Sequence, residues 1–535
     1  MHKKFRRSLT VLLQPGLFYP VWLLAMALVF AATHTRQDQL LWLLPGCIVL
    51  FVYLCRPNSK LHTVTTEQDT AKKTLCTILV TTLTICTCIL PMDDFSLWNG
   101  EIPGHRNQYE LMAENILEGR FHFEYGDEDQ LAQLQNPYDP NERKQSGVPY
   151  HWDHAFYNGT YYMYFGIVPV FLLFLPYRIL TGSPLTTYHA TQVFAAIFVA
   201  GVFSLFHLLS KLFFKKMRYS TYLTLSAALS VMSIWYSSAE PALYCTAITA
   251  AIALEIWSLY FFIKAVWAEQ TENRQICYAA VGALLGALVF GCRPPIALAN
   301  ILVLPMLAVF LRQRKFTAAV FGKLVLAALP YAMVAVALML YNYARFENPF
   351  EFGQAYQITV ADQSQYGIVL NGATLKRLIR ETGQNLFGYE KSSTQFPFVN
   401  FGGAFFNFPI LLLTAGALRP AALGNLRQKK LSGLMIGLLL TVLIITAMDI
   451  LWTPYLLERY RMDIYFLLGI ACFISIGSWT NISGSKQHAL INTAVMFLGI
   501  VTVISSFLFF MRATNVYYPD TVRKIGLMIM AWFGK

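Results

Sequence analysis

The sequence is poor in charge. Only 13% of its 535 residues are Asp, Glu, Lys or Arg, whereas 56% are hydrophobic, and a soluble protein carries roughly twice that charged share. Apolar runs of roughly 18 residues or more recur along the chain, and each can cross a hydrocarbon core of ~30 Å. The runs lack the period-two alternation of barrel strands, so we predict an all-α polytopic membrane protein.

Cysteine is absent from the long polar segments. All nine cysteines lie in or beside apolar runs, and no CxxC pair occurs. This distribution argues against disulfides and against a thiolate zinc site. The first apolar stretch, near 17–32, also lacks a convincing small-residue cleavage site, so we expect it to be a signal anchor.

Positive charge is concentrated in short segments between the apolar runs. The net charge is +12, and basic clusters stand at KKFRR near the N-terminus, at KLFFKKMR (211–218) and at RQRK (312–315). Lysine and arginine of membrane proteins collect in cytoplasmic loops. We therefore expect no nucleic-acid partner, a lipid bilayer around the chain, an N-terminus inside the cell and the large loops outside.

The apolar runs and basic loops together predict about thirteen transmembrane helices. One further apolar segment, 168–180, contains two prolines and would place the basic cluster 211–218 outside if it crossed. We expect this segment to lie flat at the membrane surface. The predicted spans lie near residues 17–32, 39–54, 74–90, 187–212, 219–237, 241–266, 276–290, 296–311, 318–341, 404–418, 431–451, 462–479 and 489–510.

These boundaries divide the chain into six regions, three of which hold the spans. The other three are two long outer loops and a short outer tail. The regions are 1–90 with three spans, 91–186 as the first outer loop with candidate acids, 187–341 with the central spans, 342–403 as the second outer loop, 404–511 with the C-terminal spans, and 512–535 as the tail.

The first outer loop contains a predicted surface helix. Its apolar residues recur at helical spacing, polar residues take the opposite face, and Gly119 ends the run. We expect this amphipathic helix to lie on the membrane. The apolar positions are Tyr109, Met112, Ala113, Ile116 and Leu117.

An aromatic stretch, YHWDHAFYNGTYYMYFG, occupies 150–166 of the same loop. Tyrosine and tryptophan favour the bilayer interface, so one interpretation is an interfacial belt. The other is the wall of a cavity, in which aromatic faces stack on sugar rings and His151, Asp153 and His154 supply hydrogen bonds. Clustering inside a loop, not at the ends of spans, favours the cavity wall.

The layout of the chain resembles the GT-C superfamily of polytopic glycosyltransferases, which includes protein O-mannosyltransferases and lipid A aminoarabinose transferases. The surface helix reads YxxxA…G from Tyr109, and it is followed by LTGSPL (180–185), an inward span ending in KLFFKK (211–216), and YNYARFENPFEFGQAY (341–356). The resemblance implies a GT-C-like fold in the bacterial cytoplasmic membrane. It also implies a polyprenyl-phosphate sugar donor and an acceptor that is a glycan, a glycolipid or a protein.

The same resemblance implies inverting transfer at the outer face, with an acidic residue of the first loop as the base. In the family an Asp-Glu pair precedes the surface-helix tyrosine, but His105 and Arg106 occupy these positions here. Inverting transfer needs a carboxylate to take the proton of the acceptor hydroxyl. We rank Glu101 first as catalytic base, followed by Asp94 and Asp93. The alternative roles are an ion pair of Glu101 with Arg106 and a solvated cap for the two aspartates.

A lipid phosphate needs cations at the outer surface. Arg293 is predicted at the outer end of a span, and Arg459 and Arg461 lie near the acids Glu458 and Asp463, so local ion pairing is their alternative role. The predicted substrate-binding residues are Arg106, Tyr109, His151, Trp152, Asp153, His154, Glu240, Arg293, Arg459 and Arg461.

No cofactor is required by this chemistry, although a divalent metal on His151, Asp153 and His154 is conceivable. Alternate side chains of an extended segment point apart, which argues against such a site. Two other functions stay open: a transporter or flippase of a lipid-linked glycan, and a non-catalytic GT-C-like protein. Most charges lie at span ends, unlike those of a transporter, and Glu255 is the main deep exception.

Overall fold

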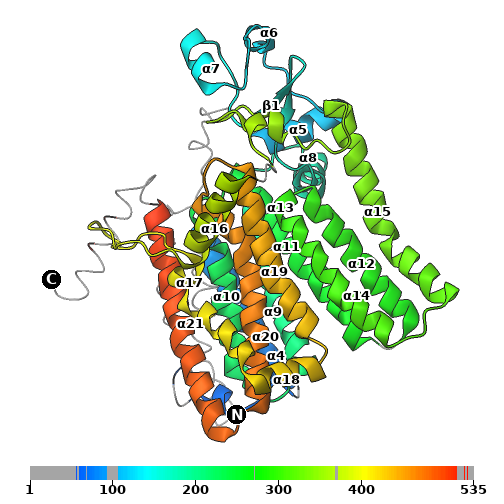
Figure 1. Ribbon diagram of the computed structural model, residues 1–535, viewed down its shortest axis with the longest axis vertical. Helices are drawn as coiled ribbons and strands as arrows, with labels where there is room; N and C mark the ends of the chain where they lie inside the picture. Colours follow the sequence, from blue (N-terminus) through cyan, green and yellow to red (C-terminus); the bar gives the residue numbers. More distant parts are fainter. Residues whose placement is uncertain are drawn as a thin grey trace, which may run out of the picture.

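The computed structural model describes residues 56, 59–67, 69–92, 107–269, 271–367, 371–514, 523 and 527. Within these residues the chain is an all-helical bundle with one small hairpin, and Figure 1 shows most helices running along its long axis. The predicted spans near 17–32 and 39–54 lie outside the described residues.

Nine helices of the described residues are long and apolar enough to cross a membrane, and a bent pair would make a tenth. The chain is therefore a polytopic membrane protein, and nine of the predicted spans coincide with these helices. They are α4 (Ala71–Ile89), α9 (Thr187–Phe213), α11 with the π-turn η4 (Leu243–Ala268), α12 (Glu272–Phe290), α13 with η5 and α14 (Pro294–Arg312), α15 (Ala318–Phe346), α19 (Ser432–Trp452), η9 with α20 (Glu458–Ile482) and α21 (Ser485–Thr514).

Helix α10 (Tyr219–Ala239) occupies the predicted span 219–237 but is not among the nine. It packs against α4, α9, α20 and α21, and almost all of its side chains are buried. Two of its hydroxyls bond to the backbone of the same helix: Ser226 and Ser233 donate to the carbonyls four residues earlier, each at 2.8 Å. A helix enclosed by other helices can be this polar because it faces protein and not lipid.

The predicted span 404–418 is not one straight helix, which corrects the sequence interpretation. It consists of α17 (Ala404–Asn407) and the 3-10 helix η8 (Pro409–Leu418), and η8 meets α18 (Pro420–Gln428) at an angle of 77°. A proline starts both η8 and α18. Because proline cannot donate a backbone hydrogen bond, a regular helix does not continue through these positions.

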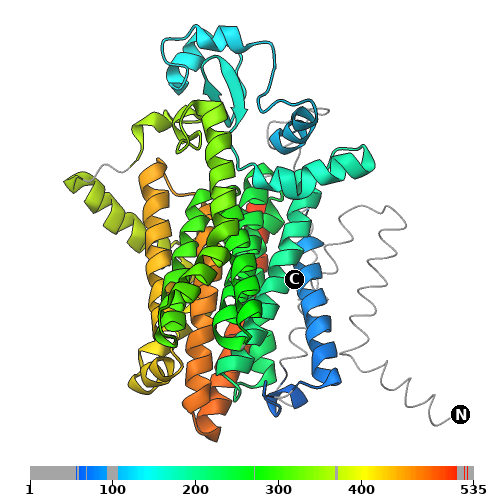
Figure 2. The same ribbon diagram turned by 90° about the vertical axis from the view of Figure 1, so that its right-hand side faces the viewer.

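The apolar segment that we expected to lie flat forms the π-turn η3 (Val170–Phe174) and α8 (Leu175–Thr181). Together they are shorter than the helices that could cross a membrane. Figure 1 shows α8 end-on and Figure 2 shows it from the side, so this helix runs across the axis of the bundle. The expected flat orientation agrees with this geometry.

The first loop has a hydrophobic core of its own. Helix α5 (Gln108–Leu117) forms where the sequence predicts it, capped by Asn107, although Leu117 is exposed. After the short helices α6 (Glu128–Ala132) and α7 (Pro140–Ser146), the chain makes an antiparallel hairpin of β1 (His154–Tyr157) and β2 (Thr160–Met163). The core residues shared by these elements include Tyr109, Met112, Phe123, Phe156, Tyr161 and Phe174.

The hairpin is an addition to the predicted all-α fold. Asn158 and Gly159 both have positive φ, 48° and 75°, at its two-residue turn. An Asn-Gly turn of this kind matches the twist of the two strands that it joins. Phe156 lies opposite Tyr161 in the register, so two of the aromatic side chains pair across the strands.

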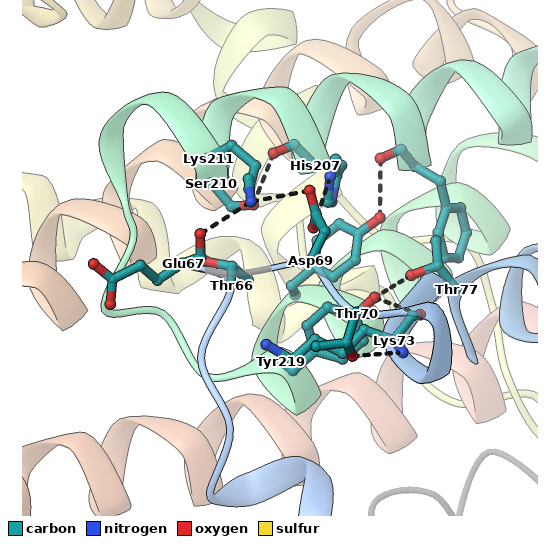
Figure 3. Close-up of polar contacts among 12 residues, drawn as sticks. Thr66, Glu67, Asp69, Thr70, Lys73, Thr77, His207, Ser210, Lys211 and Tyr219 are labelled. Carbon is teal, nitrogen blue, oxygen red and sulfur yellow. Dashed lines mark hydrogen bonds and ion pairs between the residues drawn. The ribbon is translucent and has the colours of Figure 1, made fainter. Parts of the chain in front are cut away.

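The two ends of the bundle differ in character. We call the end that carries α5, α8 and the hairpin the loop end, and the opposite end, with α18 and the turn between α9 and α10, the basic end (Figures 1 and 2). Figure 3 shows how polar contacts hold the start of α4 at the basic end. Asp69 pairs with Lys211 at 3.0 Å and His207 at 3.5 Å, and Lys73 donates to the carbonyl of Thr65 at 2.7 Å.

The first loop is joined to the bundle by a close backbone contact. The amide of Val168 donates to the carbonyl of Gly291 at 2.8 Å. A Cβ placed on Gly166 would overlap with the same Gly291 carbonyl, so only glycine fits there. The contact between the first loop and the bundle therefore requires a residue without a side chain at position 166.

We expect Gly166→Ala to lower the midpoint of thermal unfolding, because backbone atoms cannot give way and overpacking costs about 1–3 kcal/mol. The matched control is Gly322→Ala in α15, where nothing lies within 4 Å of the added atom. That variant should unfold at or slightly above the wild-type temperature. Equal midpoints for the two variants would show that the junction tolerates a side chain.

Candidate functional site

Three parts of the chain meet at the loop end around Asp153. This residue has a positive φ of 58°, so the backbone reverses between Trp152 and His154. Its amide donates to the carbonyl of Ile358 in the second loop at 2.8 Å. The left-handed conformation turns the Asp153 carboxylate away from the histidines on either side and toward the bundle.

The carboxylate of Asp153 accepts two hydrogen bonds from opposite sides. Gln357 of the second loop donates to Oδ1 at 2.8 Å, and the hydroxyl of Tyr244 donates to Oδ2. Tyr244 belongs to the first turn of α11, so this carboxylate joins both loops to the bundle. Burial raises the pKa of Asp153, while the Tyr244 hydrogen bond and the charge of Arg459 oppose the shift.

Arg459 lies beside this group without a carboxylate of its own. It belongs to the 3-10 turn η9 (Glu458–Arg461), and its guanidinium lies 4.1 Å from the ring centre of Tyr244 and 5.4 Å from that of Tyr460. No carboxylate of the described residues lies within the 4.0 Å of an ion pair with Arg459. Aromatic faces attract the cation but leave its N–H donors open for a ligand.

The other two predicted phosphate ligands at this end are neutralised by acids. Arg293 contacts Oδ2 of Asp463 through both Nε and Nη2, at 2.7 Å each. Arg461 pairs with Glu458 and donates to Asn385 at 2.9 Å. Local pairing, the alternative role that we gave to these arginines, therefore holds for Arg293 and Arg461 but not for Arg459.

One tyrosine connects the two kinds of arginine. The ring of Tyr460 lies 5.0 Å from the Arg293 guanidinium and 5.4 Å from that of Arg459. Tyr164, which follows β2, donates to Gln354 of the second loop at 2.6 Å. We call Asp153, Tyr164, Tyr244, Arg293, Arg459 and Tyr460 the loop-end cluster.

Glu240 is buried at the C-terminal end of α10, near the loop-end cluster. It accepts a hydrogen bond from the Tyr236 hydroxyl at 2.9 Å. Tyr109, in contrast, is a core residue: it is fully buried and its ring stacks on Phe174 with 5.1 Å between the ring centres. Its place is between α5 and the flat helix.

The two histidines of the aromatic stretch face the core of the first loop. The His151 ring stacks on Tyr125, and its Nε2 lies 3.2 Å from Oδ2 of Asp127. His154 is buried against the same tyrosine, whereas Trp152 is 42% exposed. The conceivable metal site on His151, Asp153 and His154 is not formed, because the Asp153 carboxylate is bound by Gln357 instead. Among the described residues, no group of three or more His, Cys, Asp or Glu side chains could hold a metal ion.

The aromatic stretch has a role that neither sequence interpretation included. Phe156 and Tyr161 pack inside the core of the first loop. Tyr157 and Tyr162 contact Phe346 at the end of α15, with ring centres 5.8 and 5.5 Å away. The rings therefore hold the first loop against the end of α15, and the belt and the cavity wall stay predictions.

The predicted bases Glu101, Asp94 and Asp93 lie outside the described residues, as does Arg106. The structure adds Tyr244, Tyr460, Gln357 and Gln354, none of which the sequence indicated as site residues. All four lie in or next to segments singled out in the sequence: Gln354 lies within 341–356, and Tyr460 lies between Arg459 and Arg461. Tyr244 follows Glu240 by four residues, and Gln357 comes directly after the segment 341–356.

No known family model matches the chain, and no curated protein sequence matches it at a significant level. Three features of the loop-end cluster bear on the function of the chain. The relevant features are the buried carboxylate, the arginine without an acid, and the tyrosines between them.

We expect the first loop to lose stability in acid through His154. The neutral ring donates from Nδ1 to the Trp152 carbonyl at 2.9 Å and accepts at Nε2 from the Tyr125 hydroxyl at 2.8 Å. Burial lowers the pKa of His154 from 6.5 to about 3. Between pH 6.5 and about pH 3, only the unfolded chain takes up this proton. The contribution of the neutral His154 ring to the free energy of unfolding is therefore fully present above pH 6.5 and decreases as the pH falls, by about 2–3 kcal/mol at pH 4.5.

The measurement is the midpoint of thermal unfolding at pH 7.5 and pH 4.5 for wild type, His154→Gln and His122→Gln. His122 belongs to the same loop but is partly exposed beside Glu124. His154→Gln should reduce the difference between the unfolding midpoints at the two pH values, and His122→Gln should leave that difference unchanged. An identical pH dependence in all three proteins would contradict the assignment to His154.

Proposed function

We propose that the protein is a glycosyltransferase that moves a sugar from a polyprenyl-phosphate donor to an acceptor at the outer face of the bacterial cytoplasmic membrane. The observation that carries the proposal is Arg459, a cation without an acidic partner among the described residues, beside the buried carboxylate of Asp153. The loop end would face outward. The layout, two long loops at one end of a helical bundle, resembles that of GT-C enzymes and supports the same function.

Arg459 would bind the donor phosphate. A polyprenyl phosphate places its charge at the membrane surface, and guanidinium forms strong, directed hydrogen bonds to phosphate oxygens. Negative charge grows on that phosphate as it leaves, so a fixed cation there stabilises the transition state. Arg293 cannot supply this charge in the same way because Asp463 already neutralises it.

The chemistry would be a single displacement with inversion. The acceptor oxygen attacks the anomeric carbon, the bond from that carbon to the phosphate oxygen breaks, and polyprenyl phosphate leaves with the bonding electrons. A carboxylate takes the proton from the acceptor hydroxyl. Glu101 is the first choice for this base, with Asp94 and Asp93 behind it.

Asp153 would act as a positioning residue. Each of its two oxygens already accepts a hydrogen bond from the protein, one from Gln357 and one from Tyr244. It thereby fixes the Tyr244 ring, whose face holds the Arg459 guanidinium. Tyrosines 164, 244 and 460 would offer aromatic faces to the sugar.

Replacing Arg459 should weaken turnover strongly. Loss of a charge-assisted contact of about 2–3 kcal/mol lowers the rate of polyprenyl-phosphate release about 30- to 150-fold. Release is measured in nanodiscs with polyprenyl-phosphate sugars and an envelope acceptor fraction. Arg459→Lys should keep part of the activity, and Arg380→Gln, at an exposed arginine of α16 (Gly372–Phe387), should keep all of it. Full activity of Arg459→Gln would overturn the phosphate assignment.

The base and the positioning residue should behave differently. We expect Glu101→Gln to lower turnover at least about 100-fold without a change in the unfolding temperature. Asp153→Asn should lower both turnover and the unfolding temperature, because the hydrogen bond between Asp153 and Tyr244 joins the first loop to the bundle. A fully active Glu101→Gln variant would transfer the role of base to Asp94 or Asp93. A fully inactive Asp153→Asn variant of normal stability would transfer it to Asp153.

A further inference from the structure

A second acidic site lies deep in the bundle, away from the loop-end cluster. Glu255 is fully buried, and neither of its carboxyl oxygens has a hydrogen-bond partner among the residues that the structure describes. It is twelve residues from the start of α11 at Leu243, which is about 18 Å along a helix and so about half of the hydrocarbon core. An acid at this depth is costly, and its presence points to a function.

The polar residues around Glu255 come from α11 itself and from two other spans. Ser258 is one helical turn further on the same face of α11, and its hydroxyl donates to the carbonyl of Gly282 in α12 at 2.9 Å. Asn300 donates to the carbonyl of Gly286, also in α12, at 2.9 Å. Tyr331 of α15 lies beside Asn300 and within electrostatic range of Glu255.

Two of these spans are irregular at the level of Glu255. Asn300 belongs to η5 (Leu298–Leu302), a 3-10 stretch that interrupts the span Pro294–Arg312. Pro330, inside α15, directly precedes Tyr331. Both features remove regular helical hydrogen bonds. Interrupted helices near the membrane midplane are the usual surroundings of sites for small charged ligands in membrane proteins.

The surroundings of Glu255 do not support a carboxylate. No Lys, Arg or His of the described residues comes within ion-pair distance, and Tyr331 of α15 is the titratable group near it. The described elements packed against α11 are α9, α10, α12, α13, α14, α20, η4 and η5, and none of them places a charged side chain beside Glu255. An isolated carboxylate in such a place costs far more free energy than a neutral carboxylic acid.

We propose that Glu255 is a proton-binding site in the middle of the helical bundle, occupied at neutral pH, so that the side chain is a carboxylic acid. The ligand is a proton, and its O–H would find acceptors in the Asn300 amide oxygen or the Tyr331 hydroxyl after a side-chain rotation. This site takes no part in the transfer chemistry proposed for the loop end and does not depend on it.

Infrared spectroscopy of the protein in nanodiscs at pH 7 tests the proposal. Glu255→Gln should remove one protonated-carboxyl C=O band that is present in the wild type. Glu240→Gln is the matched control, because Glu240 is a buried glutamate with a tyrosine donor, and it should keep that band. The proposal would be overturned if Glu255→Gln removed a carboxylate band and left the protonated-carboxyl C=O bands unchanged.

A second measurement covers the case in which Glu255→Gln does not fold. Wild-type protein with carbon-13 in its glutamates should show a protonated-carboxyl band shifted by the isotope, and aspartates such as Asp463 do not contribute to that shift. Glutamate labelling without a shifted band would equally overturn the proposal. Release of polyprenyl phosphate by a folded Glu255→Gln variant should equal that of the wild type, so the two proposals can fail separately.

Discussion

The absence of water from the hydrocarbon core is the constraint on which the rest of this structure depends. Every polar group between the membrane surfaces has to find a partner within the protein or be neutral. Helix α10 meets this condition by lying inside the bundle, where Ser226 and Ser233 bond back to its own backbone. Glu255 has no partner among the described residues, and a bound proton is the remaining way to satisfy the condition.

The same constraint explains how charge is used at the loop end. Three of the arginines there are not all held in the same way. Asp463 neutralises Arg293 and Glu458 neutralises Arg461, whereas Arg459 is held by the faces of Tyr244 and Tyr460. An aromatic face fixes a guanidinium without consuming its hydrogen bonds. Such an arginine is ready for an anion from outside the protein.

The loops are attached to the bundle through a small number of directed contacts. Asp153 adopts a left-handed backbone conformation, which is unfavourable for a residue with a side chain. Hydrogen bonds from Gln357 and Tyr244 hold it there. Backbone strain of this kind persists where the surrounding contacts over-determine it, and it often accompanies a functional site.

Hydropathy and charge along the chain determined the class of this protein, most of the spans and helix α5, because these depend on residues close together in sequence. Two predicted spans differ from a single apolar helix that faces lipid. Prolines interrupt the span 404–418, and neighbouring helices enclose the polar helix α10. The tertiary structure alone decided which arginine lacks an acid and where Asp153 points. Arg293 and Asp463 are 170 residues apart, and Asp153 and Gln357 are 204 apart. Such pairings arise only when distant helices and loops pack together, and no local pattern encodes them.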